Sequence, residues 1–221
     1  MDYRVLPVRA LQGSIDPPGD KSISHRAIIF NSIAYGASSI ENYLDGADTL
    51  ATVECLKALG VQIRFGRTHP GETGLRLTVD ARGLEDLVEA RRVLDAKNSG
   101  TTMRLLAGLL ASLPFSTVLS GDCSLNKRPM DRVIKPLREM GAGISGHDNT
   151  SFAPLTINGG LLHGIEYKMP VASAQVKSAL LLAGLSADGP TVLHQPSATR
   201  DHTERMLKAM GAAISSDGNT V

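Results

Sequence analysis

The stretch LKALGVQI, Leu56 to Ile63, decides how the rest of the chain is interpreted, because close copies of it occur twice more. The copies are LREMGAGI, Leu137 to Ile144, and LKAMGAAI, Leu207 to Ile214. Each copy joins an amphipathic helical pattern to a glycine and an apolar β-type segment. Each therefore predicts a helix that ends at glycine and is followed by a strand. The chain is predicted to contain three structural repeats.

A second helix is predicted ahead of each copy, over residues 21–34, 98–113 and 173–187. All three segments open with small polar residues and then become apolar on nearly every side, a pattern typical of buried helices. Strand-type runs occur at residues 38–44, 75–81, 116–121, 154–159 and 191–195. The pattern predicts an α/β (α+β) fold, a pseudo-threefold domain of βαβαββ-type units with buried parallel helices inside and sheets outside.

The domain organisation follows from the repeats. Residues 1–14 are interpreted as one or two short strands outside the repeats, and residues 15–221 as one domain. The three repeats are expected at about 15–90, 91–165 and 166–221.

Composition excludes several classes of function. The chain has 221 residues and a net charge of +1, with 4% aromatic residues and no Trp. Such a chain has no bulk field for nucleic acid or an anionic membrane, and no stacking platform for bases. Cys55 and Cys123 lack metal-site spacing and are expected to be reduced thiols in or near the core. No apolar signal or membrane-length run is present, so a soluble cytoplasmic protein is expected.

The starts of the three predicted buried helices carry the functional signal. They are Lys21-Ser22, residues 98–102 (NSGTT) and residues 173–175 (SAQ). Related by a threefold axis, these starts converge, and their unpaired N–H groups and positive dipole ends point to one place. Nearby guanidinium groups suit carboxylate or phosphate ligands. These guanidiniums belong to Arg26, Arg128 and Arg200.

Simpler interpretations exist for most of these residues. A single Ser-rich helix start is usually only a cap, Asp20 fits a cap or turn, and His25 is more often a packing or surface residue than a general base. The recurrence of the same arrangement at three matching positions favours an anion-binding site over capping alone.

Five stretches together resemble the EPSP synthase family, the 3-phosphoshikimate 1-carboxyvinyltransferases. They are PGDKSISHRA (18–27), NSGTTMRLLAG (98–108), GDCSLNKRPM (121–130), ASAQVKSALLLAGL (172–185) and TRDHTE (199–204). The first and fourth are similar to the class II variants, which include glyphosate-insensitive enzymes. Some of those have alanine at the position of Gly100, so the glycine here leaves the response to glyphosate open.

The resemblance implies transfer of the enolpyruvyl group of phosphoenolpyruvate to the 5-hydroxyl of shikimate 3-phosphate, in aromatic amino acid biosynthesis. It implies no metal and no organic cofactor. Lys21 is the implied catalytic residue, in contact with both substrates. The residues implied to hold shikimate 3-phosphate are Lys21, Ser22, Arg26, Ser173, Ala174, Gln175 and Arg200. Those implied to hold phosphoenolpyruvate are Lys21, Asn98, Gly100, Arg128 and Gln175.

The chain departs from the family in its length, because family members have two such domains. We therefore expect the N-terminal, shikimate-3-phosphate-binding half of the enzyme, with residues 1–14 belonging to the missing C-terminal domain. Such a half is expected to bind shikimate 3-phosphate weakly and to be inactive alone, and a complementary C-terminal half is its candidate partner. The alternatives are a UDP-N-acetylglucosamine enolpyruvyl transferase and a non-catalytic module that binds a phosphorylated metabolite.

Overall fold

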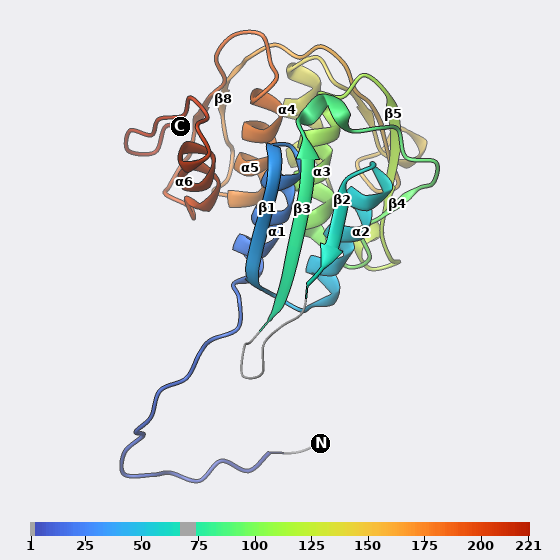
Figure 1. Cartoon of the computed structure of the whole chain (residues 1–221). Helices are drawn as coiled ribbons and strands as arrows, with labels where there is room; N and C mark the ends of the chain where they lie inside the picture. Colours follow the sequence, from blue (N-terminus) through green and yellow to red (C-terminus); the bar gives the residue numbers. More distant parts are fainter. Residues whose placement is uncertain (1–2, 67–73) are drawn as a thin grey trace.

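The computed structural model describes residues 3–66 and 74–221, which form helices wrapped by sheets (Figure 1). The α-helices are α1 (Lys21–Ser32), α2 (Ala47–Ala58), α3 (Gly100–Ala111), α4 (Asp131–Glu139), α5 (Ala174–Gly184) and α6 (His202–Ala209). The strands are β1 (Tyr35–Tyr43), β2 (Gln62–Phe65), β3 (Leu75–Arg82), β4 (Leu94–Asp95), β5 (Ser116–Ser120), β6 (Gly143–Ser145), β7 (Leu155–Asn158), β8 (Glu166–Lys168) and β9 (Val192–His194). Three short 3-10 helices are η1 (Leu84–Asp86), η2 (Leu125–Lys127) and η3 (His147–Asn149).

The strands form three separate sheets, one for each repeat. The first has the order β1-β3-β2 and is antiparallel, and the second has the order β4-β5-β7-β6. In the third, β8 and β9 pair in parallel. Alternate residues of β3, namely Leu77, Val79 and Ala81, are buried toward the helices, as expected for a sheet with one solvated face. The mixed α/β fold predicted from the repeats is confirmed.

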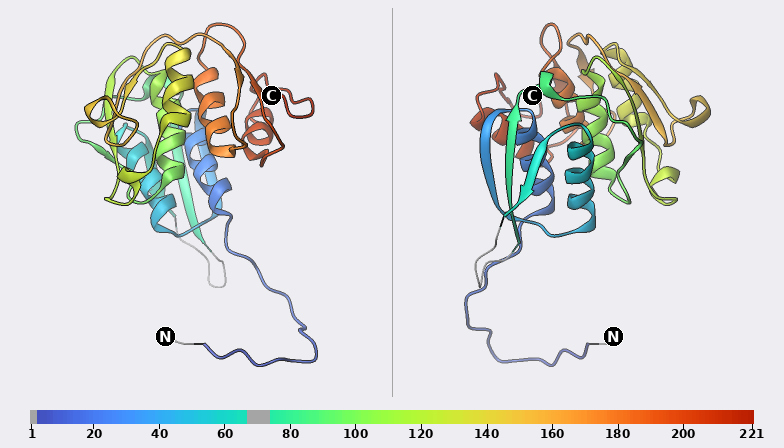
Figure 2. Two further views of the ribbon diagram at one scale, coloured as in Figure 1. Left: turned by 180° about the vertical axis from the view of Figure 1, so that it is seen from behind. Right: turned by 45° about the vertical axis from the view of Figure 1, so that its right-hand side comes forward.

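Helices α3 and α5 pack against each other in the interior, as Figure 2 shows. Their backbones approach closely at Gly108, where an added Cβ atom would lie 2.1 Å from the main-chain oxygen of Ala179. Only glycine permits this approach. Nearly every side chain of α3 and α5 beyond the first turn is buried, which confirms the prediction of helices apolar on all sides.

The repeated glycine ends a helix in all three repeats, as predicted. Gly60, Gly141 and Gly211 have φ values of 96°, 101° and 92°, which lie in the left-handed region that favours glycine. The following strand forms in the first two repeats, where β2 pairs with β3 and β6 pairs with β7. The strand predicted after Gly211 is wrong. Thr220 and Val221 pair with β9 instead, so residues 212–214 have no neighbouring strand to bond to.

The start of the chain, expected to belong with a second domain, extends away from the body. In the described part of the 1–14 segment, residues 3–14, no strand is formed. Residues 3–19 leave the body as an extended tail without helix or strand (Figure 1). The side chains of Val5, Leu6 and Leu11 are largely exposed, so the segment lies outside the core.

Two further features of the described residues bear on function. Both cysteines are free thiols, but only Cys55 is buried, whereas Cys123 is exposed and not near the core as expected. No helix in residues 3–66 and 74–221 is both long and apolar enough to cross a bilayer.

Candidate anion-binding site

Each of the three buried helices begins with a side-chain cap. Asp20 Oδ1 accepts from the Ile23 N–H at 2.8 Å, Ser99 Oγ from Thr102 at 3.1 Å, and Ser173 Oγ from Val176 at 3.4 Å. The capping role suggested for Asp20 is confirmed. A cap satisfies the third N–H group of its helix, and geometry gives the first two no partner within the helix. Two N–H groups at each helix start therefore remain available to a ligand.

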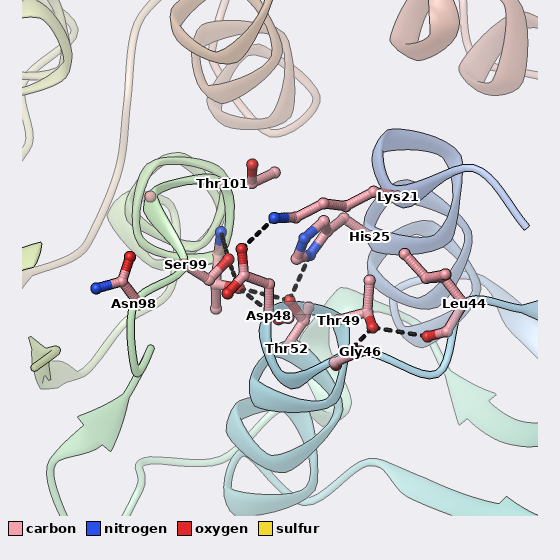
Figure 3. Close-up of polar contacts among 12 residues, drawn as sticks. Lys21, His25, Leu44, Gly46, Asp48, Thr49, Thr52, Asn98, Ser99 and Thr101 are labelled. Carbon is pink, nitrogen blue, oxygen red and sulfur yellow. Dashed lines mark hydrogen bonds and ion pairs between the residues drawn. The ribbon is translucent and has the colours of Figure 1, made fainter. Parts of the chain in front are cut away.

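The first contact between helix starts joins α1 to α2. The Lys21 Nζ atom forms an ion pair with the Asp48 carboxylate, and Figure 3 shows Lys21 reaching across to it. Sequence analysis assigned no partner to Lys21. The position of Asp48 has a local explanation, because Asp48 lies in the first turn of α2, where the helix dipole favours an acid.

Beneath this pair lies a buried chain of polar groups. His25 Nδ1 is 2.7 Å from Thr52 Oγ1, which is 2.7 Å from Thr102 Oγ1, which in turn lies 2.7 Å from the capping Ser99 Oγ. Burial, followed by the charge of Lys21, lowers the pKa of His25 from 6.5 to about 4. The imidazole is therefore neutral at pH 7 and joins α1, α2 and α3.

Gln175 joins the starts of α3 and α5. Its Nε2 atom donates to Thr101 Oγ1 at 2.8 Å, and its Oε1 atom accepts from Arg104 Nη1 at 2.7 Å. Arg104 was not identified from the sequence, although it lies four residues after Gly100 and so on the same face of α3. An added Cβ at Gly100 would lie 2.6 Å from Arg104 Nη1 and 3.6 Å from Arg128 Nη1, so both guanidiniums flank this helix start.

Arg26 joins α1 to α5 and α6. It is 3% exposed, and its guanidinium donates to the main-chain oxygen of Ser22, to Ser178 Oγ and to Thr203 Oγ1, at 2.9, 2.5 and 2.7 Å. Burial, followed by the charge of Arg200, lowers the pKa of Arg26 to about 10, so it stays charged at pH 7. Arg26 thus has three partners inside the chain, and its implied contact with a substrate stays a prediction.

Arg200 closes the ring of contacts. Its Nη1 atom donates to Ser22 Oγ at 2.7 Å, which connects the segment before α6 to the start of α1. The contacts now run from α1 to α2, α3, α5, α6 and back to α1. The contacts confirm the prediction that the helix starts converge. We use the name anion ring for the starts of these helices together with Arg26, Arg104, Arg128 and Arg200.

One buried ion pair supports the α5–α6 side of the ring. Lys177 Nζ lies 2.5 Å from Glu204 Oε1, and these side chains are 1% and 8% exposed. Glu204 also opposes the lowering of the Arg26 pKa. Sequence analysis missed the pair, because nothing in the spacing of Lys177 and Glu204 shows that α5 and α6 pack together.

A second chain of polar contacts lies at one edge of the anion ring, and the second repeat forms this edge. Arg128 Nη2 donates to Asn98 Oδ1 at 2.6 Å, and Asn98 Nδ2 donates to Asp122 Oδ2 at 2.7 Å. The hydrogen bond from Asn98 lowers the pKa of Asp122. Both residues implied to hold phosphoenolpyruvate here, Asn98 and Arg128, therefore lie together beside Gly100.

Most cations of the anion ring lack a neutralising carboxylate. Within the described residues, Arg104, Arg128 and Arg200 form no ion pair, and their hydrogen-bond partners are amide, hydroxyl and main-chain oxygens. Burial, followed by the charges of Arg128 and Arg132, lowers the pKa of Arg104. The cations thus destabilise one another, and a bound anion relieves that repulsion. No cluster of three or more His, Cys, Asp or Glu side chains suited to a metal occurs among residues 3–66 and 74–221.

The fold and the ring define the class: an α/β repeat domain built around converging, positively charged helix N-termini. Residues 5–221 match the family EPSP synthase (3-phosphoshikimate 1-carboxyvinyltransferase), and the chain belongs to this family.

Named relatives agree with this assignment. A 3-phosphoshikimate 1-carboxyvinyltransferase of Desulforudis audaxviator is 53% identical over the whole chain, and one of Bacillus thuringiensis is 52% identical. The solved EPSP synthase of Acinetobacter baumannii superposes with a TM-score of 0.88 at 45% identity, over 94% of this chain and 46% of that one. The chain spans about half the length of the curated relatives it matches, 50% for each of the two named here. These names favour the expected family over a UDP-N-acetylglucosamine enolpyruvyl transferase.

Proposed function

We propose that this chain supplies the shikimate 3-phosphate side of a 3-phosphoshikimate 1-carboxyvinyltransferase. In that reaction the 5-hydroxyl of shikimate 3-phosphate adds to C2 of phosphoenolpyruvate while C3 gains a proton. Phosphate then leaves from C2 as C3 loses a proton, so the enolpyruvyl ether forms. Both substrates are anions that carry a phosphate and a carboxylate, which a cluster of N–H groups and guanidiniums can hold.

The observation that carries the proposal is the charge imbalance of the anion ring. Arg104, Arg128 and Arg200 all face neutral partners, whereas Arg76 on the exposed sheet pairs with Glu41 at 2.6 Å. The chain has 22 acidic residues, so the neutral partners of these arginines do not reflect a shortage of carboxylates. Cations kept without counter-ions beside unpaired helix N–H groups are typical of a site that receives its negative charge from a ligand.

The roles of individual residues are part of the proposal. Lys21 contacts both substrates, because it is the first residue of α1 and its side chain extends toward the start of α3 (Figure 3). Ser22, Arg26 and Arg200 hold shikimate 3-phosphate together with the start of α5, residues 173–175. Phosphoenolpyruvate is held by Asn98, Gly100, Arg128 and Gln175. We add Arg104 to this set because it donates to Gly100 and Gln175.

The same proposal covers domain organisation. Residues 15–221 form the shikimate-3-phosphate-binding domain, and residues 1–14 pair with a sheet of a second domain. The chain alone binds shikimate 3-phosphate and catalyses no transfer, and a complementary half completes the site. The cytoplasmic location expected from the sequence remains a prediction.

Calorimetric titration tests the proposal. Shikimate 3-phosphate is titrated into the wild-type chain, with shikimate as the ligand that lacks the phosphate. We expect binding of the phosphorylated ligand that weakens as salt is raised, and at least tenfold weaker binding of shikimate. The Arg200→Ala variant should bind about tenfold more weakly, since one charge-assisted hydrogen bond is lost.

A second measurement separates an enzyme part from a binding module. The wild-type chain is mixed with the C-terminal half of a relative such as the Desulforudis audaxviator enzyme, and phosphate release from both substrates is followed. Restored turnover supports the proposal. Equal affinity for shikimate and its 3-phosphate, or turnover by the chain alone, would contradict it.

A further inference from the structure

His25 is a fully buried polar residue, 0% exposed, to which the proposed function gives no role. It lies directly below the Lys21–Asp48 ion pair, and Figure 3 shows its ring beside the Lys21 side chain. Its Nδ1 atom has one partner, Thr52 Oγ1 at 2.7 Å. Its Nε2 atom has no partner among the described residues. A buried imidazole with one satisfied nitrogen needs an explanation.

The surrounding residues form two tiers with the same helical spacing. Lys21 and His25 are four residues apart on α1, and Asp48 and Thr52 are four residues apart on α2. Residues at this spacing lie one above the other on a helix. The upper tier, Lys21 with Asp48, is partly exposed, and the lower tier, His25 with Thr52, is buried. Whatever fixes the lower tier therefore fixes the separation of the two charged groups above it.

The lower tier continues into α3 and ends at its cap. Thr52 Oγ1 meets Thr102 Oγ1, and Thr102 Oγ1 lies within reach of Ser99 Oγ and, at 3.3 Å, of the main-chain oxygen of Asp48. Each hydroxyl has one hydrogen to donate. If His25 Nδ1 carries its proton, the hydrogens of His25, Thr52 and Thr102 each have an acceptor, which is Thr52, Thr102 and Ser99 in turn.

The opposite tautomer is less favourable on two grounds. An N–H at Nε2 would be a buried donor without an acceptor. It would also place positive hydrogen density near the Lys21 ammonium, whose charge already disfavours a protonated ring. A lone pair at Nε2 avoids both problems. The hydrogen-bond pattern therefore selects the Nδ1–H form.

We propose that His25 is a positioning residue, which in its neutral Nδ1–H form heads a buried hydrogen-bond chain that sets the spacing of the starts of α1, α2 and α3. It contacts no substrate. It acts through Thr52 and Thr102, and the groups whose positions depend on it are Lys21, Asp48 and the N–H groups capped by Ser99. The effect on a ligand rests on the proposed function, because shikimate 3-phosphate is the ligand used as the probe.

The first test is spectroscopic and independent of any ligand. Long-range ¹H–¹⁵N correlation spectra of the wild-type chain at pH 7 report which imidazole nitrogen carries the proton, and the His25 signals are assigned by their loss in the His25→Asn variant. We expect a protonated Nδ1 and an unprotonated Nε2. A protonated Nε2, or a rapidly averaging ring, overturns the proposal.

The second test compares two isomeric placements of an amide. In His25→Asn the amide nitrogen occupies the position of Nδ1 and can still donate to Thr52, whereas in His25→Gln it reaches the position of Nε2. His25→Leu has no donor. We expect His25→Asn to bind shikimate 3-phosphate within about threefold of wild type, and His25→Gln and His25→Leu to bind about tenfold more weakly, the loss expected for one buried hydrogen bond.

The outcomes separate this inference from the proposed function. If wild type binds shikimate 3-phosphate but His25→Asn loses as much affinity as His25→Leu, the positioning role is wrong and the function stands. If wild type does not bind, the proposed function fails. The His25 tautomer and the thermal unfolding midpoints then test the hydrogen-bond chain without a ligand. We expect the midpoint of His25→Asn to lie above those of His25→Gln and His25→Leu.

Discussion

His25 and Arg26 are neighbours on one turn of α1, yet they hold the two flanks of the anion ring in opposite ways. His25 joins α1 to α2 and α3 as a neutral group, below a lysine that has its own carboxylate. Arg26 joins α1 to α5 and α6 as a buried cation, and Glu204, the acid that most raises its pKa, is paired with Lys177. Positive charge is thus balanced on the His25 flank by the partly exposed Lys21–Asp48 pair. On the Arg26 flank it is balanced by the buried Lys177–Glu204 pair.

The difference shows where the ring's positive charge comes from. On the His25 flank, Asp48 partly cancels Lys21. On the Arg26 flank, and at the second-repeat edge, the hydrogen-bond acceptors of Arg200 and Arg128 among the described residues are neutral oxygens. A ligand's phosphate therefore gains most from the guanidiniums, while Lys21 must give up the Asp48 carboxylate before it can bind a ligand anion. The flanks should also respond differently to mutation and to pH.

The largest expected effect is on the Arg26 flank. Lys177→Met leaves Glu204 buried without its ion-pair partner, which should lower the free energy of unfolding by about 3 to 5 kcal/mol. Urea denaturation monitored by circular dichroism measures this. The control is the Lys177→Met/Glu204→Leu double variant, in which both charges are gone and most of the stability should return. A single variant as stable as wild type would show that the pair does not hold α5 to α6.

Acid should weaken the His25 flank next. The pKa of His25 is about 4 in the folded chain against 6.5 for an ordinary histidine, so the unfolded chain takes up the proton first as the pH falls. The contribution is complete above pH 6.5 and is lost between 6.5 and about 4, amounting to about 3 kcal/mol. Unfolding free energies measured by urea across this range test it. His25→Asn should remove that part of the pH dependence, and an unchanged slope would contradict the assignment.

A smaller effect is expected where the flanks meet. Gly108→Ala puts a Cβ 2.1 Å from the Ala179 oxygen and must separate α3 from α5, at about 1 to 3 kcal/mol of stability. Gly160→Ala is the matched control, because its added Cβ meets nothing within 4 Å. Thermal unfolding of both variants measures the difference. Equal midpoints would mean that the helices tolerate a wider spacing.

The smallest expected change concerns Lys21. Asp48→Asn removes the carboxylate that competes with the ligand, so shikimate 3-phosphate should bind about two- to fivefold more tightly at low salt, the range of a partly exposed ion pair. The gain should fade in high salt. Titration calorimetry at two salt concentrations measures it. Weaker binding would instead assign Asp48 a role in orienting Lys21.

Local pattern was enough to predict the elements and their glycine ends. The helices over 21–34, 98–113 and 173–187 formed as α1, α3 and α5, because their all-round apolar character leaves only the interior for them. The strand after Gly211 failed for the opposite reason, since a strand depends on a neighbour that the helix pattern does not specify. Residues 3–14 depend on a neighbour in the same way, and the sheet expected to receive them lies outside this chain, so their expected pairing stays a prediction.

The site was predicted in its residue types but not in its pairings. The recurrence of small polar helix starts indicated Lys21, Gly100 and residues 173–175, and the structure brings these starts into one ring. Contacts such as Lys177 with Glu204, or Gln175 with Arg104, join residues far apart in sequence. They depend on which helices pack together, and no local spacing encodes that.

The central claim is that one anion site lies where the helix starts meet. A crystal structure of the chain soaked with shikimate 3-phosphate tests it most directly. The account predicts the ligand's phosphate and carboxylate within hydrogen-bonding distance of Lys21, of the start of α5 at residues 173–175, and of Arg200. A ligand bound elsewhere on the surface, with Lys21 still paired to Asp48 and Arg200 still bonded to Ser22, would contradict it.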